Sequence, residues 1–554
     1  MQESVFQLAL VLTLLVAALT ITARQMQWPV PIVMLGAGIA ISFIPGVPTV
    51  TLDPDLVLLL LLPPLLYSSG VGMSWPGFKS ELTSILMLAV GCVLFTATAV
   101  AAVVHYTLGL SWASGFVLGA IVSPPDAVAP MAIARRLGLP HRLATIIEGE
   151  SLVNDATALV VFSIALGAVA TGSFSFTDAA LRFVAVGIGE IVYGAALGWL
   201  MLWLRNKAAD PQTELLLALA TPFIAFWLPH ELGGSGVIAS VAAGLYVSWN
   251  GPRLIRPATR LQGFFIWGLL VWAIEALVFL LTGLQAHRIA MALTDGRAAR
   301  LLYAGFIVSV TVILVRFLWI FPATYVKHYV NCSGRDPMDW RSPFFLSFAG
   351  LRGVVSLAAA LSIPIFVGNS LYADRDLILF TTFCVIVTTL VGLGGALPTV
   401  IERLGLSHTG RSERIRNTHD EQIARMSGVT AALAEIDRAA ADGASADVIA
   451  SLRRRHTDRL ENLTATADES NDDNPIAEVS ALEFRVVTAE RAAINAAHKD
   501  GRLSDVARRR IERELDLEQA RIEHQLQSSG GQNADPREHP AGRPVIVAAA
   551  ASTG

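Results

Sequence analysis

Residues 143–170 have the sequence LATIIEGESLVNDATALVVFSIALGAVA, a long apolar stretch that nevertheless carries Glu148, Glu150 and Asp155. About 20 mostly apolar residues are enough for a helix to cross the hydrocarbon core of a bilayer. An ionisable side chain at that depth costs roughly 2.5–3.5 kcal/mol on insertion scales, so its presence indicates a function. The stretch therefore predicts a membrane-spanning helix with functional carboxylates.

Twelve further apolar stretches flank this one, and 53% of all residues are hydrophobic, which is more than an ordinary soluble domain contains. We predict an all-α polytopic membrane protein with about thirteen transmembrane helices. The expected spans are residues 4–23, 28–46, 55–73, 83–108, 112–133, 143–170, 178–204, 212–228, 233–249, 264–284, 298–323, 343–366 and 375–400.

Charge is distributed unevenly along the chain. Residues 1–400 hold 20 basic and 19 acidic residues, whereas the 154 residues that follow hold 21 and 26. This asymmetry predicts a transmembrane domain at 1–401, a cytoplasmic charged helical region at 402–527 and a disordered tail at 528–554. The net charge of −4 is a sum over unlike parts, and no nucleic-acid partner is expected.

Basic residues in the short loops predict the orientation. Loops after odd-numbered spans carry thirteen Lys and Arg residues, and the even-side loops carry at most five. Cytoplasmic loops hold the excess of Lys and Arg. We therefore expect a plasma (inner) membrane protein with its N-terminus outside and its C-terminus in the cytoplasm.

Two spans contain helix-breaking residues near their middle. The fifth contains Ser123-Pro124-Pro125-Asp126-Ala127-Val128, and the twelfth contains Ala349-Gly350-Leu351-Arg352-Gly353. Prolines remove backbone donors, and carbonyls freed in lipid must find other partners. The breaks are seven spans apart, so the two helices cross in opposite directions. Interrupted helices at corresponding positions of two halves are typical of inverted-repeat transporters.

The sixth span presents oxygen atoms on two adjacent stripes. Ser151 and Asp155 are four residues apart and share a face, and Glu150 and Asn154 share the next. Oxygen ligands suit a hard cation, so Asp155, which shares its face with Ser151, is a candidate binding site for a cation. One carboxylate can hold either a proton or a cation, and competition between them is sufficient for exchange. We expect no cofactor apart from the transported Na⁺ and H⁺.

The other charges within the spans have structural or pathway interpretations. A buried unpaired guanidinium is costly, so we predict that Arg352 forms a structural ion pair with Glu150. Glu275 in the tenth span either lines the ion path or pairs with Arg316.

Together, the segments Ser123-Pro-Pro-Asp126-Ala-Val-Ala, Glu148-Gly-Glu-Ser-Leu-Val-Asn154-Asp155 and Gly350-Leu-Arg352-Gly-Val-Val-Ser resemble the sodium/hydrogen exchanger family in its bacterial form, over roughly residues 1–405. The resemblance implies a thirteen-helix homodimer whose core domain moves as an elevator. It implies Asp155 as the ion- and proton-binding carboxylate, with Asn154, Asp126 and Ser151 in support. An Asn-Asp pair implies electroneutral exchange.

The chain also departs from the family pattern. Many members carry an acid shortly after a Pro-Pro pair in the third span, where this chain has Pro63-Pro64-Leu-Leu-Tyr67-Ser68. Ser68 is therefore expected at the ion path with one carboxylate fewer in the site.

We predict a secondary active Na⁺/H⁺ antiporter, with K⁺ or Li⁺ as further candidate substrates, and not an enzyme. K⁺/H⁺ exchange as the main activity stays open, because selectivity lies in cavity size and ligand number. An intramembrane hydrolase would need a second catalytic aspartate or a zinc motif such as His-Glu-x-x-His, and the sequence contains neither. A channel would need rings of acids or pore carbonyls, which one pair of broken helices does not supply.

Overall fold

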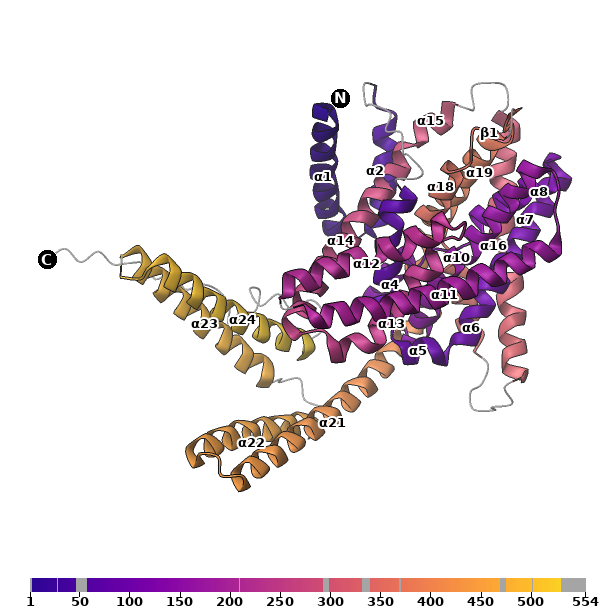
Figure 1. The fold of residues 1–554 in the computed structure, drawn as a ribbon. Coiled ribbons are helices and arrows are strands. Elements are labelled where there is room, and N and C mark those ends of the chain that lie inside the picture. The colour runs from indigo at the N-terminus through magenta and orange to yellow at the C-terminus, as the bar shows by residue number, and fades with distance from the viewer. Residues whose placement is uncertain are drawn as a thin grey trace. The chain divides into compact units, whose positions relative to one another are not determined.

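The computed structural model describes residues 2–26, 28–45, 57–208, 210–291, 298–330, 339–367, 370–468, 475–500 and 502–529. The chain forms two compact units, Met1–Arg416 and Asn417–Gly554. We call them the membrane unit and the tail unit, and almost all of the described residues in both are helical (Figure 1). The predicted all-α fold is therefore confirmed.

The first half of the membrane unit contains α1 (Gln2–Gln25), α2 (Val30–Ser42), η1 (Val57–Leu61), α4 (Leu62–Gly72), α5 (Trp75–Ser80), α6 (Leu82–Leu86), η2 (Met87–Cys92), α7 (Val93–Leu108), α8 (Trp112–Val122), α9 (Val128–Leu137) and α10 (His141–Thr171). The second half contains α11 (Phe176–Lys207), α12 (Pro211–Glu231), α13 (Val237–Leu254), α14 (Pro257–Leu284), α15 (Ala286–Met291), α16 (Ala298–Val330), α17 (Arg341–Phe348), α18 (Val354–Leu361), α19 (Arg375–Val387), η4 (Thr388–Leu393) and α20 (Gly394–Arg403).

Helices occupy each of the thirteen stretches expected to span the membrane. Among the described residues, seven helical stretches are long and apolar enough to cross a bilayer, and four apolar helices are shorter. The number of thirteen crossings stays a prediction. The twelfth stretch ends as a helix at Leu361 and not at 366, since Pro364 disfavours helical backbone at the residue before it. A short antiparallel pair follows, β1 (Phe366–Val367) and β2 (Ser370–Leu371).

Two pairs of glycines let helices cross at close range, and the expected inverted repeat relates the pairs to one another. A Cβ atom on Gly38 of α2 would lie 2.9 Å from the Cα of Gly283 on α14, and one on Gly244 of α13 would lie 3.1 Å from the Cα of Gly70 on α4. The close glycine contact between spans two and ten therefore corresponds to the close glycine contact between spans nine and three. Exchanging the two halves converts one crossing into the other, as an inverted repeat requires.

The tail continues in helices α21 (Leu406–Ala441), α22 (Ala446–Asp468), α23 (Pro475–Lys499) and α24 (Asp505–Ser529). Helices α23 and α24 pack through Val487, Leu515 and Ile522. The membrane unit extends beyond the predicted boundary at 401 because the first turns of α21 pack on it, with Leu406 buried. Residues 469–474 lie outside the described residues, and the predicted disordered tail lies outside them from residue 530 onward.

Candidate functional site

Both predicted helix breaks are present. Helix α8 ends at Val122 and α9 begins at Val128, while α17 ends at Phe348 and α18 begins at Val354. Pro124 and Pro125 have no backbone N–H, so the helix cannot continue through them. In the first break, the Asp126 N–H donates to the carbonyl of Leu351 in the second break at 2.7 Å. The two interrupted segments are therefore joined directly through their backbones.

Arg352 donates hydrogen bonds in the opposite direction, from the second break to the end of the first broken helix. Its Nε donates to the carbonyl of Val122, the last residue of α8, at 2.6 Å, and its Nη1 donates to the carbonyl of Gly350 at 3.0 Å. The backbone N–H of Arg352 donates to Oγ1 of Thr389 at 3.1 Å. Helix ends leave carbonyls without helical partners, and in a membrane these must be satisfied within the protein. Arg352 supplies that partner for the first broken helix.

The two glycines of the second break allow charged side chains to approach the backbone. A Cβ atom on Gly353 would lie 2.5 Å from Cγ of Asp126, and one on Gly350 would lie 2.5 Å from Nε of Arg316. Neither contact leaves room for a larger residue. The Gly-Leu-Arg-Gly segment is thus shaped by the carboxyl group of Asp126 and the guanidinium of Arg316.

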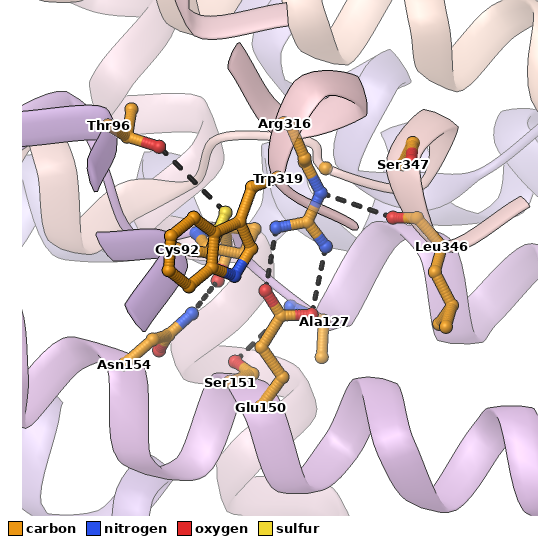
Figure 2. A network of polar contacts seen from close by, with 12 residues as sticks. Cys92, Thr96, Ala127, Glu150, Ser151, Asn154, Arg316, Trp319, Leu346 and Ser347 are labelled. Atoms are coloured by element: carbon orange, nitrogen blue, oxygen red, sulfur yellow. Dashed lines mark hydrogen bonds and ion pairs between the residues drawn. The ribbon is translucent and has the colours of Figure 1, made fainter. Parts of the chain in front are cut away.

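The predicted ion pair between Glu150 and Arg352 is wrong. Glu150 pairs with Arg316 of α16, whose Nη1 and Nη2 donate to Oε1 and Oε2 at 2.6 and 2.8 Å (Figure 2). Both side chains are almost fully buried, 1% and 3% exposed. Arg316 also donates through Nε to the carbonyl of Leu346 in the last turn of α17, at 3.1 Å. The physical reason for the difference is that the carbonyl groups of the breaks, and not a carboxylate, take the hydrogen bonds of Arg352.

Arg316 is the site residue whose ion pair the sequence analysis missed. It was noted only as one of two alternatives for Glu275. The signal was a lone arginine in the apolar segment Val312-Ile-Leu-Val-Arg316-Phe-Leu-Trp319, which requires a partner as much as Arg352 does. The three guanidinium nitrogens of Arg316 donate to Glu150 and to the carbonyl of Leu346, and Glu275 is not among the hydrogen-bond partners of Arg316 within the described chain.

Helix α10 brings its polar residues against the first break, as the sequence analysis expected. Nδ2 of Asn154 donates to the carbonyl of Pro125 at 2.7 Å, and Oγ of Ser151 accepts from the N–H of Ala127 at 3.3 Å (Figure 2). The Oδ1 atom of Asn154 is buried and has no hydrogen-bond partner in the protein. Oxygen atoms of α10 thus border the interrupted backbone.

Asp155 lies one residue further along α10 and is 8% exposed. Within the described part of the chain, no arginine, lysine or histidine lies within ion-pair distance of Asp155 or Asp126. Asp126 caps α9 through the Val128 N–H at 3.0 Å and is close enough for its charge to act on Asp155. Two carboxylates therefore face the breaks without a basic partner, whereas Glu150 is fully paired.

The remaining predicted residues lie on flanking helices. Ser68 is on α4, which packs on α10 through Leu62 and Leu66, but its hydroxyl donates to the carbonyl of Leu65 within its own helix at 2.9 Å. Glu275 is half-buried on α14. A role for either in an ion path stays a prediction.

Helix α10 also contacts a π-helical segment, η2, which the sequence analysis did not foresee. The carbonyl of Met87 accepts from Nε1 of Trp319 at 3.0 Å, and Cys92 lies 3.9 Å from Oγ1 of Thr96. Such π-bulges often occur at functional sites. Trp319 is one turn beyond Arg316, so the same face of α16 holds both η2 and Glu150.

Comparisons with known proteins agree with this geometry. The family model described as sodium/hydrogen exchanger, transmembrane, matches residues 10–403. An uncharacterised Na⁺/H⁺ exchanger of Mycobacterium tuberculosis is 32% identical over 94% of this chain and 96% of its own length. A Na⁺/H⁺ antiporter of Aphanothece halophytica is 31% identical over 79% of this chain and 81% of its own.

The fold is also similar to a solved structure. The sodium proton antiporter of Methanocaldococcus jannaschii matches with a TM-score of 0.59 at 19% identity, over 73% of this chain and 99% of that one. That likeness concerns the fold alone. The family match covers the membrane unit, where both breaks and α10 lie. The chain belongs to the transmembrane sodium/hydrogen exchanger family, and it is a secondary transporter and not an enzyme.

Proposed function

We propose that this protein exchanges Na⁺ for H⁺ by competition of the two ions at Asp155. The observation that carries the proposal is the contrast between two buried carboxylates on one helix. Glu150 is neutralised by Arg316, whereas Asp155 has no basic partner among the described residues. An unpaired carboxylate at this depth is costly unless it holds a proton or a cation. Each loaded form is close to neutral and the empty form is not.

The charges of the site support one-for-one exchange. Asp126, Glu150 and Asp155 contribute three negative charges, and Arg316 and Arg352 contribute two positive ones. The sum is one negative charge, which one Na⁺ or one H⁺ cancels. We therefore propose an electroneutral cycle in which the same net charge crosses in both directions.

Oxygen atoms around Asp155 supply the ligands that Na⁺ requires. We assign the cation to Asp155 with Ser151. We assign supporting roles to Asn154, which donates to the carbonyl of Pro125 in the first break, and to Asp126, which accepts from the Val128 N–H. Hard monovalent cations prefer such carboxylate, hydroxyl and carbonyl oxygens. The relative from Aphanothece halophytica, named as a Na⁺/H⁺ antiporter, supports Na⁺ as the substrate.

K⁺ exchange is the second candidate function. A relative from Bacillus subtilis, 31% identical over 72% of this chain and 62% of its own length, is named as a sodium, potassium, lithium and rubidium/H⁺ antiporter. The replacement of a family acid by Ser68 also changes the number of charged oxygens available. A site with fewer carboxylates competes less strongly for the smaller ion, so a broad cation range is consistent with it.

We further propose a homodimer in the plasma membrane with the N-terminus outside and the C-terminus in the cytoplasm. The excess of basic residues in loops after odd-numbered spans supports that orientation. The tail unit then lies in the cytoplasm, in keeping with its charged helices.

The test is cation-induced proton movement in proteoliposomes, recorded with a pH-sensitive dye for Na⁺, Li⁺, K⁺ and Rb⁺. Wild-type protein should respond to Na⁺, and Asp155→Asn should abolish the response to every cation. Asp178→Asn is the matched control, because Asp178 is an exposed carboxylate in the first turn of α11. Full exchange by Asp155→Asn would refute the assignment of the site, and a response to K⁺ alone would favour the second candidate.

A further inference from the structure

A small cavity lies apart from the ion site, between α15 and the beginning of α19. Its volume is about 70 Å³, well above the roughly 10–15 Å³ that a single water molecule needs. Arg288 of α15 and Arg375, the first residue of α19, both line it. Figure 1 shows α15, α18 and α19 at the same end of the membrane unit.

The two arginines line the same cavity, together with one acid, Asp376. Nε of Arg375 donates to the carbonyl of Ile363 at 2.9 Å, which fixes its guanidinium, and the charges of Asp376 and Arg288 are both close enough to act on it. Neither forms an ion pair with any residue that the structure describes. Two guanidinium groups at one cavity favour an anion with several acceptor oxygens, since Arg binds phosphate through paired N–H groups.

The other residues that line the cavity limit the chemical class of ligand that fits it. Asp376 also lines the cavity, so its three charged residues sum to +1, and the buried amide of Gln285 adds a neutral polar group. The remaining lining residues, such as Leu361 and Phe380, are apolar. A ligand with one phosphate and an apolar portion fits this lining, whereas a cation or a highly charged polyanion does not.

The place of the cavity along the helices agrees with such a ligand. Two candidate spans run from Pro257 to Met291 and from Arg375 to Arg403. Arg288 is near the end of the first span, and Arg375 begins the second. Both arginines are therefore at the depth where helices leave the hydrocarbon core and lipid phosphates lie. We propose that the cavity binds a phosphate-bearing anion between Arg288 and Arg375, in the form of an anionic phospholipid headgroup.

The test measures binding to the full-length protein in a neutral detergent, through the unfolding temperature as a function of ligand concentration. The probes are short-chain phosphatidylglycerol, short-chain phosphatidylcholine and inorganic phosphate. Arg288→Gln is the main variant, because Arg288 is exposed and no structural hydrogen bond depends on it in the described chain. Arg182→Gln is the matched control, because Arg182 is an exposed arginine on α11 that donates to the carbonyl of Gly233.

Phosphatidylglycerol should bind wild-type protein and Arg182→Gln equally, and Arg288→Gln at least about tenfold more weakly, as the loss of a charge-assisted contact implies. Asp376→Asn should bind more tightly, because it removes the one acid that faces the anion. Non-specific attraction of lipid to arginines near the membrane would instead affect Arg288→Gln and Arg182→Gln alike, and that outcome would overturn the proposal.

The probes also identify the source of the phosphate. A response to phosphatidylglycerol but not to inorganic phosphate or phosphatidylcholine supports the lipid headgroup. An equal Arg288-dependent response to inorganic phosphate supports the same site with a free anion as its ligand. Absence of any Arg288-dependent binding refutes the site. No readout involves transport, so this result is independent of the proposed exchange activity.

Discussion

The carboxylate of Glu150 and the guanidinium of Arg316 form a bidentate ion pair with distances of 2.6 and 2.8 Å, buried between α10 and α16. The pair joins the ion-site helix of the first half to a helix of the second half. Because Arg316 also holds the carbonyl of Leu346 at the end of α17, it connects α10 to the second broken helix. Arg352 is bonded in the same way to the first broken helix, because its Nε donates to the carbonyl of Val122 at the end of α8.

Breaking this pair on one side should destabilise the protein strongly. Glu150→Gln leaves the guanidinium of Arg316 buried without its counter-charge, which typically costs about 3–5 kcal/mol. The double variant Glu150→Gln/Arg316→Met should recover part of that loss, because it removes both charges. Thermal unfolding of purified wild-type, single and double variants would measure the coupling. Equal stability of Glu150→Gln and wild type would contradict the buried pair.

Gly353→Ala should disturb the position of Asp126. The added Cβ atom would meet the carboxyl group of Asp126 at 2.5 Å, so the side chain must shift or the backbones must separate. Overpacking of this kind usually costs about 1–3 kcal/mol, and we expect exchange to fall because Asp126 is close enough for its charge to act on Asp155. Gly392→Ala is the control, since no atom lies within 4 Å of the Cβ position there. Dye-based exchange assays on both variants would show whether the effect is specific to Gly353.

Both breaks and the polar face of α10 could be predicted from the sequence because their causes are local. Pro124 and Pro125 remove donors wherever the chain goes, and Ser151 and Asp155 share a face of any helix that contains them. The proximity of the two breaks follows from their matching places in two inverted halves. These inferences need only backbone chemistry and helical spacing.

The partner of Glu150 could not be predicted in the same way. Arg316 and Arg352 are both lone arginines in apolar spans, and the choice depends on how α16 and α17 pack against α10. The carbonyl groups that satisfy Arg352 become available only once the helices have broken. The π-helical segment η2 is equally non-local, because Trp319, more than 200 residues away, binds its first carbonyl.

The exchange that we propose to be electroneutral in the wild-type protein should become sensitive to voltage in Asn154→Asp. The substitution changes the summed charge of the site from −1 to −2, so a single bound cation no longer neutralises it. A displaced charge responds to a membrane potential with about 2.3 kcal/mol per 100 mV. Proteoliposomes in which valinomycin and K⁺ gradients set the potential would measure this. Voltage-dependent Na⁺/H⁺ exchange by the wild type would contradict the proposed stoichiometry.

The apparent affinity for Na⁺ should fall as the pH falls. At high pH, Asp155 holds no proton and Na⁺ binds without competition, so affinity should be independent of pH. Below the pH at which the empty site takes up a proton, each unit should weaken the apparent affinity by about tenfold, the slope for one competing proton. Half-maximal Na⁺ concentrations measured across pH would give the slope. A flat profile would exclude competition at a single acid.

The first turns of α21 should stabilise the beginning of α10. Pro140 is at the N-cap of α10 and has no side chain that can accept a hydrogen bond there, and Oε2 of Glu413 in α21 accepts from the N–H of His141 at 2.9 Å. Gly410 crosses so close to Gly138 and Leu139 that a Cβ atom on it would lie 3.0 Å from the carbonyl carbon of Leu139. The part of α21 that belongs to the membrane unit thus supplies a negatively charged cap to a helix whose own sequence lacks one.

Glu413→Ala should therefore cost about 0.5–2 kcal/mol, the usual effect of losing an N-cap. Glu413→Gln should cost less, about 0.3–1 kcal/mol, because it keeps the acceptor and loses only the charge that favours a helix N-terminus. Hydrogen exchange of the amides at residues 141–144 should accelerate in that order. Glu435→Ala is the matched control, since Glu435 pairs only with the exposed Arg438 within α21. If amide hydrogen exchange at residues 141–144 is equally fast in Glu413→Ala and Glu435→Ala, then α21 does not stabilise the beginning of α10. The contact with Glu413 would then contribute no free energy to the helix.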